Sequence, residues 1–246
     1  MDALVKFTNQ SQGRDRLLRA TQYACSLSVY LLRNNSNSKD LVVKLKSLER
    51  NMSAGRKLLR LGNTAHSIEA AKRTMRLSDR VLCLCLTAAN VNRALYFICD
   101  NALWAANVGL ARNLDKDRWS LNAHRFYFFS LVMNLTRDAY DVLRLMVQNS
   151  RDKQFRQQMN QHLNEGPDVA EAVIPQLDAL FYLLLHTLKS HPAVALDALK
   201  NICDLFIPLD RLGIYQSNAG VVGFCGLMSS LIGIVTLAQP TLKIKP

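Results

Sequence analysis

Several kinds of residue and motif are scarce in this sequence. Six cysteines among 246 residues are too few for a disulfide-built scaffold, and 10 glycines and 6 prolines exclude collagen-like and low-complexity chains. No Gly-rich phosphate loop, zinc-protease motif or nucleophile elbow occurs in it. Cys83 and Cys85 have no second Cys/His pair nearby, so we expect buried thiols rather than a zinc site. These absences predict a protein that is not an enzyme and has no metal or cofactor.

Positive charge is concentrated in the first part of the chain. The net charge is +12, and residues 1–93 hold 17 Lys and Arg against 6 Asp and Glu. Such a surplus indicates an anionic partner, either nucleic acid or a membrane surface. The basic part has few aromatics and no helix-turn-helix, zinc-finger or RNA-binding signature, which argues against nucleic acid. Anionic membrane lipid is therefore the expected partner.

A long uncharged stretch near the end of the chain predicts a membrane span. Between Arg211 and Lys243 lie 31 residues without a charge, and residues 219–239 are their apolar core. A helix of about 20 residues covers the ~30 Å hydrocarbon core of a bilayer. A second, less apolar span is predicted at 94–111, where Asp100 shares a helix face with Arg93 and the two form a polar pair turned toward a bundle interior. The alternative is that this segment lies in the membrane interface or against a partner helix.

Small residues recur in the C-terminal span at spacings of three and four. They are Gly220, Gly223, Gly226, Ser230 and Gly233. Such a face lets helix backbones approach closely, and we expect self-association through it. The alternative is that glycine is simply frequent in membrane helices.

A basic amphipathic helix is predicted over residues 56–80. Its apolar stripe would lie in the acyl boundary of a membrane, while its cations contact anionic headgroups. The residues expected to do this are Arg56, Lys57, Leu58, Arg60, Leu61, Ala65, Ile68, Lys72, Arg73, Met75 and Arg76. The alternative is an ordinary amphipathic helix that packs on its neighbours.

The predicted fold class is an all-α integral membrane protein with one strong and one weaker transmembrane helix. No apolar segment typical of a signal peptide opens the sequence. The positive-inside tendency places residues 1–93 in the cytosol together with the tail at 240–246, which holds Lys243 and Lys245. Both termini are then expected on the same side of the membrane.

Residues 112–218 are expected to be a helical middle region, lumenal or membrane-associated. A polar stretch at 148–171 is the best candidate for a hinge, because Gly166 and Pro167 break helices. A later helix is expected to begin at Pro192 and to end before Pro208.

Four sequence blocks then occur in order: the opening MDALVKFTNQSQGRDRLLRATQYAC, the internal SAGRKLLRLGN and NRALYFICDNALW, and the late CDLFIPLDRLGIY before the glycine-rich span. Nearly end to end, the chain resembles the peroxin-11 family of peroxisomal membrane proteins. The opening block is more similar to the alpha form, whereas RKLLRLGN, CDLFIPLD and the KP ending are more similar to the beta form. The glycine-rich insertion of beta forms is absent, and both isoforms stay open.

The resemblance implies a protein that promotes protrusion, elongation, proliferation and fission of peroxisomes. It assigns membrane insertion to the basic helix at 56–80, and oligomerisation and peroxisomal targeting to the C-terminal span. The partners it implies are further copies of this chain, other family members, a dynamin-related fission GTPase with its tail-anchored adaptors, and the peroxisomal membrane-protein import receptor. Coatomer binding is not expected, because Lys243 and Lys245 are one position out of the KxKxx register. The alternative function is an oligomeric pore for small metabolites, lined by Arg93 and Asp100.

Overall fold

The described part of the structure, a computed structural model, comprises residues 10–33, 39–111, 113–151 and 174–242, and its regular secondary structure is entirely helical. This confirms the predicted all-α fold. The helices are α2 (Ser11–Leu32), α3 (Lys39–Leu59), α4 (Asn63–Thr74), α5 (Arg80–Val108), α6 (Lys116–Arg151), α8 (Ile174–Ser190), α9 (Pro192–Arg211) and α10 (Ala219–Ala238), followed by the short 3-10 helix η2 (Pro240–Leu242).

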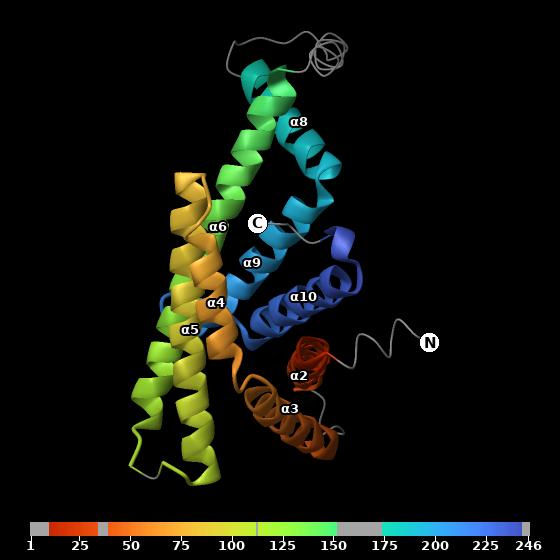
Figure 1. Cartoon of the computed structure of the whole chain (residues 1–246). Coiled ribbons are helices and arrows are strands. Elements are labelled where there is room, and N and C mark those ends of the chain that lie inside the picture. The colour runs from red at the N-terminus through yellow and green to blue at the C-terminus, as the bar shows by residue number, and fades with distance from the viewer. Residues whose placement is uncertain (1–9, 34–38, 112, 152–173, 243–246) are drawn as a thin grey trace.

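A long hairpin of α5 and α6 forms one side of the molecule, and α4 lies along α5 (Figure 1). Gly109 adopts a φ of 92° at the C-terminus of α5, a conformation that glycine tolerates best and that ends the helix. At the other end Asp79 caps α5 by accepting hydrogen bonds from the backbone of Val81 and Leu82. Tyr140 of α6 donates a 3.0 Å hydrogen bond to the same carboxylate, so the cap also joins the two helices of the hairpin.

The second part of the molecule is a stack of α10, α2 and α3 beside the hairpin (Figure 1). Helix α9 connects the two parts, because it packs on α6 and also on α10. Helix α8 precedes α9 and is separated from it at His191. It lies toward the end of the hairpin that is farthest from the α5–α6 turn (Figure 1).

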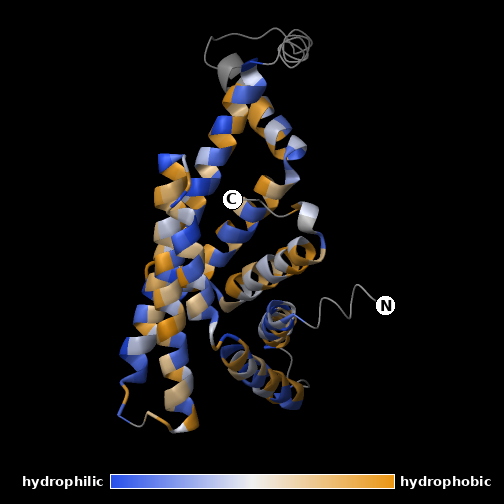
Figure 2. Cartoon of the chain, in the orientation of Figure 1, coloured by the Kyte–Doolittle hydropathy of each residue, from blue (hydrophilic) through white to orange (hydrophobic). Residues whose placement is uncertain are grey.

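Among the described residues, two helices are long and apolar enough to cross a membrane, namely α5 and α10. They correspond to the two predicted spans, and α10 is the more apolar (Figure 2). Helix α5 begins at Arg80, fourteen residues before the predicted start at 94. Both helices expose apolar side chains: Leu84, Val91, Leu95 and Ile98 on α5, and Val221, Phe224, Leu231 and Val235 on α10.

The single helix predicted over 56–80 is divided in the structure. Helix α3 ends at Leu59, and Gly62 has a φ of 88°, which is outside the range of a right-handed helix. Helix α4 then ends at Thr74, five residues before the Asp79 cap of α5. The periodic apolar pattern continued across both breaks, which is why the sequence indicated one helix.

The end predicted for the helix after Pro192 is also wrong. Helix α9 passes through Pro208 and ends at Arg211. A proline inside a helix removes one backbone donor and crowds the preceding turn. Pro208 is nevertheless fully buried, so the tertiary packing around it outweighs that cost. The hinge predicted at 148–171 begins inside α6, which continues to Arg151, and its remainder lies outside the described residues.

Candidate membrane interface

Helix α4 packs on α5 through small residues. It buries Ser67, Ala71 and Thr74. Polar contacts hold it there, including a 3.0 Å hydrogen bond between the hydroxyls of Thr74 and Thr87. Larger apolar side chains of α3, α4 and the segments that follow them are exposed and define what we call the ridge: Leu58 of α3 at 53% exposure, Leu61 in the next turn at 40%, Ile68 of α4 at 45% and Met75 directly after α4 at 65%, with Ala65 of α4 also exposed.

Cations flank the ridge, but fewer than the sequence predicted. Lys72, Arg73 and Arg76 are exposed, and Lys57 is partly exposed. Arg56 and Arg60 are buried, with 9% and 8% of their surface accessible. These two arginines are therefore not available to lipid headgroups in this structure.

Arg56 and Arg60 instead belong to a buried cluster that joins α2, α3 and α5. The Nε atoms of both arginines donate hydrogen bonds to Oδ1 of Asp15, each at 3.2 Å. Arg56 also donates to Gln22 at 2.6 Å. Burial alone would raise the pKa of Asp15, but the guanidinium groups of Arg60 and Arg56 lower it overall. The cluster fixes the end of α3, and with it the start of the ridge.

Asp100 has a different partner from the one expected. Its Oδ2 accepts a 3.2 Å hydrogen bond from Nη1 of Arg60, which also donates to the hydroxyl of Tyr96. Among the described residues Arg93 forms no ion pair with Asp100, so the predicted polar pair is not found. Arg93 and Asp100 do share a face of α5, but the carboxylate pairs with Arg60, which directly follows α3.

The small-residue face of α10 is covered by α2 of the same chain. A Cβ on Gly223 would lie 3.2 Å from the backbone nitrogen of Leu27. The other close approaches run antiparallel along the two helices: Gly220 meets Tyr30, Gly226 meets Tyr23, and Gly233 meets Arg16. Ser230 is buried and donates a 2.6 Å hydrogen bond to the carbonyl of Gly226 within its own helix. The face predicted for self-association therefore packs within the chain here, and self-association through it stays a prediction.

A buried polar triad fixes α2 against α9 and α10. Arg19 and Ser229 both donate hydrogen bonds to Oδ1 of Asp204. Burial would raise the pKa of Asp204, but Arg19 and the Ser229 hydroxyl lower it overall. This triad was not predicted from the sequence. Only the polar residues Ser229 and Ser230 within an apolar span could have signalled that this face of α10 meets polar partners.

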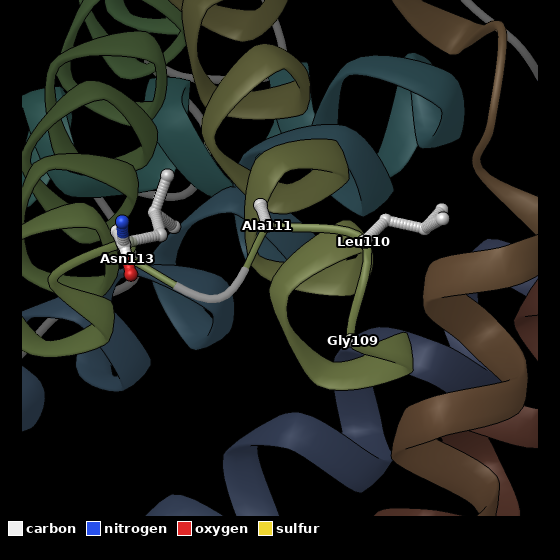
Figure 3. A pocket seen from close by; sticks show the side chains of 5 residues that line it. Gly109, Leu110, Ala111 and Asn113 are labelled. Carbon is white, nitrogen blue, oxygen red and sulfur yellow. The ribbon is translucent and has the colours of Figure 1, made fainter.

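One hollow in the described part of the surface is not suited to binding a small substrate. A hollow at the α5–α6 turn is lined by Gly109, Leu110, Ala111, Asn113 and Leu114. Figure 3 shows Leu110 and Asn113 pointing in different directions, so no polar groups converge there. Among the described residues no group of three His, Cys, Asp or Glu side chains is placed to hold a metal ion. Cys85 is buried and Cys83 half-buried.

These features define a class: helical proteins with two candidate membrane spans among the described residues and an exposed apolar ridge that runs from the end of α3 to the residue after α4. The sequence matches the family described as Peroxisomal biogenesis factor 11 (PEX11) over residues 1–238. The chain belongs to this family and is a peroxisomal membrane protein. The family is named for peroxisome biogenesis and not for a reaction.

Relatives of two kinds are equally similar to this chain. Peroxisomal membrane protein 11A of Bos taurus is 46% identical over 245 residues, with 100% of this chain and 99% of the relative covered. Peroxisomal membrane protein 11B of Homo sapiens is 46% identical over 259 residues, with both chains fully covered. A homolog from Dictyostelium discoideum is 24% identical over 244 residues, covering 95% of this chain and 92% of its own. No solved structure matches. Identity alone therefore does not separate the alpha and beta forms.

Proposed function

We propose that this protein promotes protrusion, elongation and fission of peroxisomes by inserting the ridge into the cytosolic leaflet of the peroxisomal membrane. The observation that carries the proposal is that α4 packs through small residues, while Ile68 of α4 and Met75 directly after it are exposed. Exposed apolar surface bordered by cations is suited to an anionic membrane, where apolar side chains enter the acyl boundary and cations contact headgroups. Insertion into one leaflet expands it relative to the other and favours curvature.

The proposed topology places the ridge and both termini on the cytosolic side. Because α4 lies along α5 from Thr87 to Asn101, insertion of the ridge in the plane of the leaflet requires α4 to separate from α5. Helix α5 is 29 residues long, which corresponds to about 44 Å at 1.5 Å per residue. This exceeds the ~30 Å hydrocarbon core, so part of α5 extends beyond it. The basic residues before α5, together with the positive-inside tendency, favour the cytosol for that end.

Self-association and recruitment complete the proposed mechanism. Local density of inserted ridges would rise if copies assemble through the glycine face of α10, once α2 leaves it. Family resemblance supports cooperation with other family members, with a dynamin-related fission GTPase and its tail-anchored adaptors, and with the peroxisomal membrane-protein import receptor. Lys243 and Lys245, the basic tail residues, lie outside the described residues.

The test uses the full-length protein reconstituted into vesicles that contain anionic lipid. The triple variant Leu58→Glu, Leu61→Glu, Ile68→Glu should lose the ability to form tubules, as seen by electron microscopy, because charged side chains do not enter the acyl region. It should retain its helical circular dichroism, since all three side chains are at least 40% exposed. In cells it should fail to elongate peroxisomes.

A matched control places three glutamates on exposed apolar positions away from the ridge: Leu143→Glu, Val147→Glu and Leu180→Glu. This control should form tubules like the wild type. Equal tubulation by the ridge variant and the control would refute the proposed role of the ridge.

The flanking cations offer a second test. Replacing Lys72, Arg73 and Arg76 by Gln should weaken the attraction of the ridge to anionic headgroups by about 1 kcal/mol for each cation. Tubulation of the reconstituted anionic vesicles should therefore decrease, and the difference from the wild type should diminish at high salt, because surface electrostatic attraction is screened. Unchanged tubulation at low salt would show that these cations do not face the membrane.

A further inference from the structure

Helix α9 turns a polar side toward the rest of the protein. Its buried residues are Asn201, Asp204 and Pro208. Asp197 and Lys200 lie on the same side, because residues three and four apart share a face of a helix. The interior side of α9 is therefore formed by charged and amide side chains together with one proline.

The charges on this side are all engaged within the chain. Asp197 accepts hydrogen bonds from Arg137 of α6 and from Lys200 of its own helix. Asn201 donates a 2.6 Å hydrogen bond to Oδ2 of Asp138, which is also on α6. The triad described above continues the same side toward α2 and α10. The polar side of α9 thus joins three other helices.

The opposite side of α9 is apolar and faces outward. Leu199 is 45% exposed and Ile202 48% exposed. They belong to a series at spacings of four and three, which places its members on one face: Ala195, Leu199, Ile202, Phe206 and Leu209. The charged residues between positions 192 and 209 number three, and all of them are on the polar side. The outward face is therefore free of charge over most of the helix.

This arrangement is the reverse of that in a water-soluble amphipathic helix, which buries its apolar stripe and exposes its charges. Charged groups that are paired inside the protein, behind an apolar exterior, are typical of a helix in contact with hydrocarbon. Composition alone does not reveal such a helix, because its internal charges make it resemble a soluble one. Only the burial of Asp197, Lys200 and Asp204 against protein shows that these charges do not need water.

We infer that the outward face of α9 contacts the acyl chains of the peroxisomal membrane. Helix α9 packs directly on α10, the more apolar of the two candidate spans, so the hydrocarbon around α10 extends to α9. The face of α10 that is exposed beside it is apolar as well, with Phe224 and Val221. The uncharged surface of α9 matches that environment. This lipid contact is separate from the ridge and does not depend on the function proposed for it.

The test places a tryptophan on this face in the full-length protein, reconstituted into phosphatidylcholine vesicles with or without brominated acyl chains. The two native tryptophans, Trp104 and Trp119, are replaced by Phe, so that the introduced residue is the only emitter. Brominated acyl chains should quench the emission of Ile202→Trp as strongly as that of Phe224→Trp on α10, and aqueous iodide should not. The control is Lys116→Trp, at an exposed position beside the α5–α6 turn, which should show the reverse.

Two outcomes of this experiment would overturn the inference. Quenching of Ile202→Trp by iodide but not by brominated lipid would mean that the face lies in water. Emission that neither quencher reaches would mean that protein, such as a second copy of this chain, covers it.

A second variant keeps both native tryptophans. Leu199→Asn with Ile202→Asn should lower the Tm of the reconstituted protein, followed by helical circular dichroism, by roughly 5–10 °C, because amides without partners are unfavourable in hydrocarbon. The matched control is Leu41→Asn with Val43→Asn, at exposed apolar positions of α3, where Tm should stay within about 2 °C of the wild type. An unchanged or higher Tm for the α9 variant, or an equal fall in both variants, would contradict a lipid-facing α9.

Discussion

Gly223 of α10 lies against the backbone of Leu27 in α2, so closely that a Cβ on Gly223 would be 3.2 Å from the Leu27 nitrogen. This contact lies in the middle of an antiparallel pair of helices that also brings Gly220 to Tyr30 and Gly226 to Tyr23. The close packing of α10 on α2 explains why glycines recur at this spacing along α10. One side of α10, a helix apolar enough to span a membrane, is therefore covered by α2.

Replacing Gly223 by Leu should destabilise the protein. The larger side chain would push α2 away, and overpacking of this kind costs about 1–3 kcal/mol. At this chain length Tm should fall by roughly 2–4 °C per kcal/mol. Val221→Leu is the control, because Val221 is exposed on the same helix. Identical melting of the two variants would show that α2 does not occupy the glycine face in solution.

Weakening α2 while keeping the glycines separates packing from self-association. The variant Tyr23→Ala with Tyr30→Ala removes the rings that cover Gly226 and Gly220. If the freed face associates with a second copy, co-precipitation of two differently tagged chains should increase over the wild type. Adding Gly223→Leu to this variant should abolish the increase. Co-precipitation that is the same in all three proteins would locate self-association elsewhere.

Two glycines at the start of the ridge should respond in opposite directions to alanine. Gly62 has a φ of 88°, where a side chain is strained, so Gly62→Ala should cost about 1 kcal/mol of unfolding free energy. Gly55 is inside α3, and a Cβ there would meet Leu18 at an ordinary 3.6 Å. Gly55→Ala should therefore stabilise the protein by about 0.5–1 kcal/mol. A stabilising Gly62→Ala, measured by denaturant unfolding, would favour the continuous helix predicted over 56–80.

The buried arginine cluster should contribute far more than an exposed ion pair. Arg60→Met leaves Asp100 buried without its cation, and removal of one partner of a buried pair costs about 3–5 kcal/mol. The control is Lys44→Met, which breaks the exposed 2.7 Å pair with Asp40 and should change stability by less than about 0.5 kcal/mol. Denaturant unfolding of both variants gives the comparison. Similar effects would mean that Arg60 is solvated rather than buried.

Because of the buried carboxyl of Asp138, the protein should be more stable at mildly acidic pH than at neutral pH. Burial raises the pKa of this carboxyl to about 6 from an ordinary 3.8, although Arg137 and the amide of Asn201 oppose the shift. Because the folded state holds the proton more tightly, the penalty is present above pH 6 and is relieved as pH falls toward 4. The full penalty is on the order of 3 kcal/mol, because the pKa rises from 3.8 to about 6 and each pKa unit corresponds to about 1.4 kcal/mol.

The measurement for Asp138 is the difference in unfolding free energy between pH 7 and pH 4. Asp138→Asn should remove this component of the pH dependence, whereas Asp117→Asn, at an exposed position, should leave it unchanged. A pH profile that is identical for the wild type and Asp138→Asn would contradict the shifted pKa.

Local pattern and composition determined the helices, both candidate spans and the family. Periodic apolar residues and the 31-residue uncharged run are properties of neighbouring positions along the chain, so they can be recognised without knowledge of long-range contacts. The exceptions include the helix ends near Gly62 and Pro208. There a single backbone conformation, and the packing around a buried proline, outweighed the periodic pattern.

Tertiary structure alone decided which charged and small residues are available to a partner. The sequence presented Arg56, Arg60 and Arg73 as equivalent cations, but the first two point toward Asp15, which lies more than forty positions away in the chain. Asp100 pairs with Arg60 rather than with Arg93, for the same reason of proximity across helices. Burial makes such pairs obligatory, because a charge removed from water needs a counter-charge, and only the fold determines which residue supplies it.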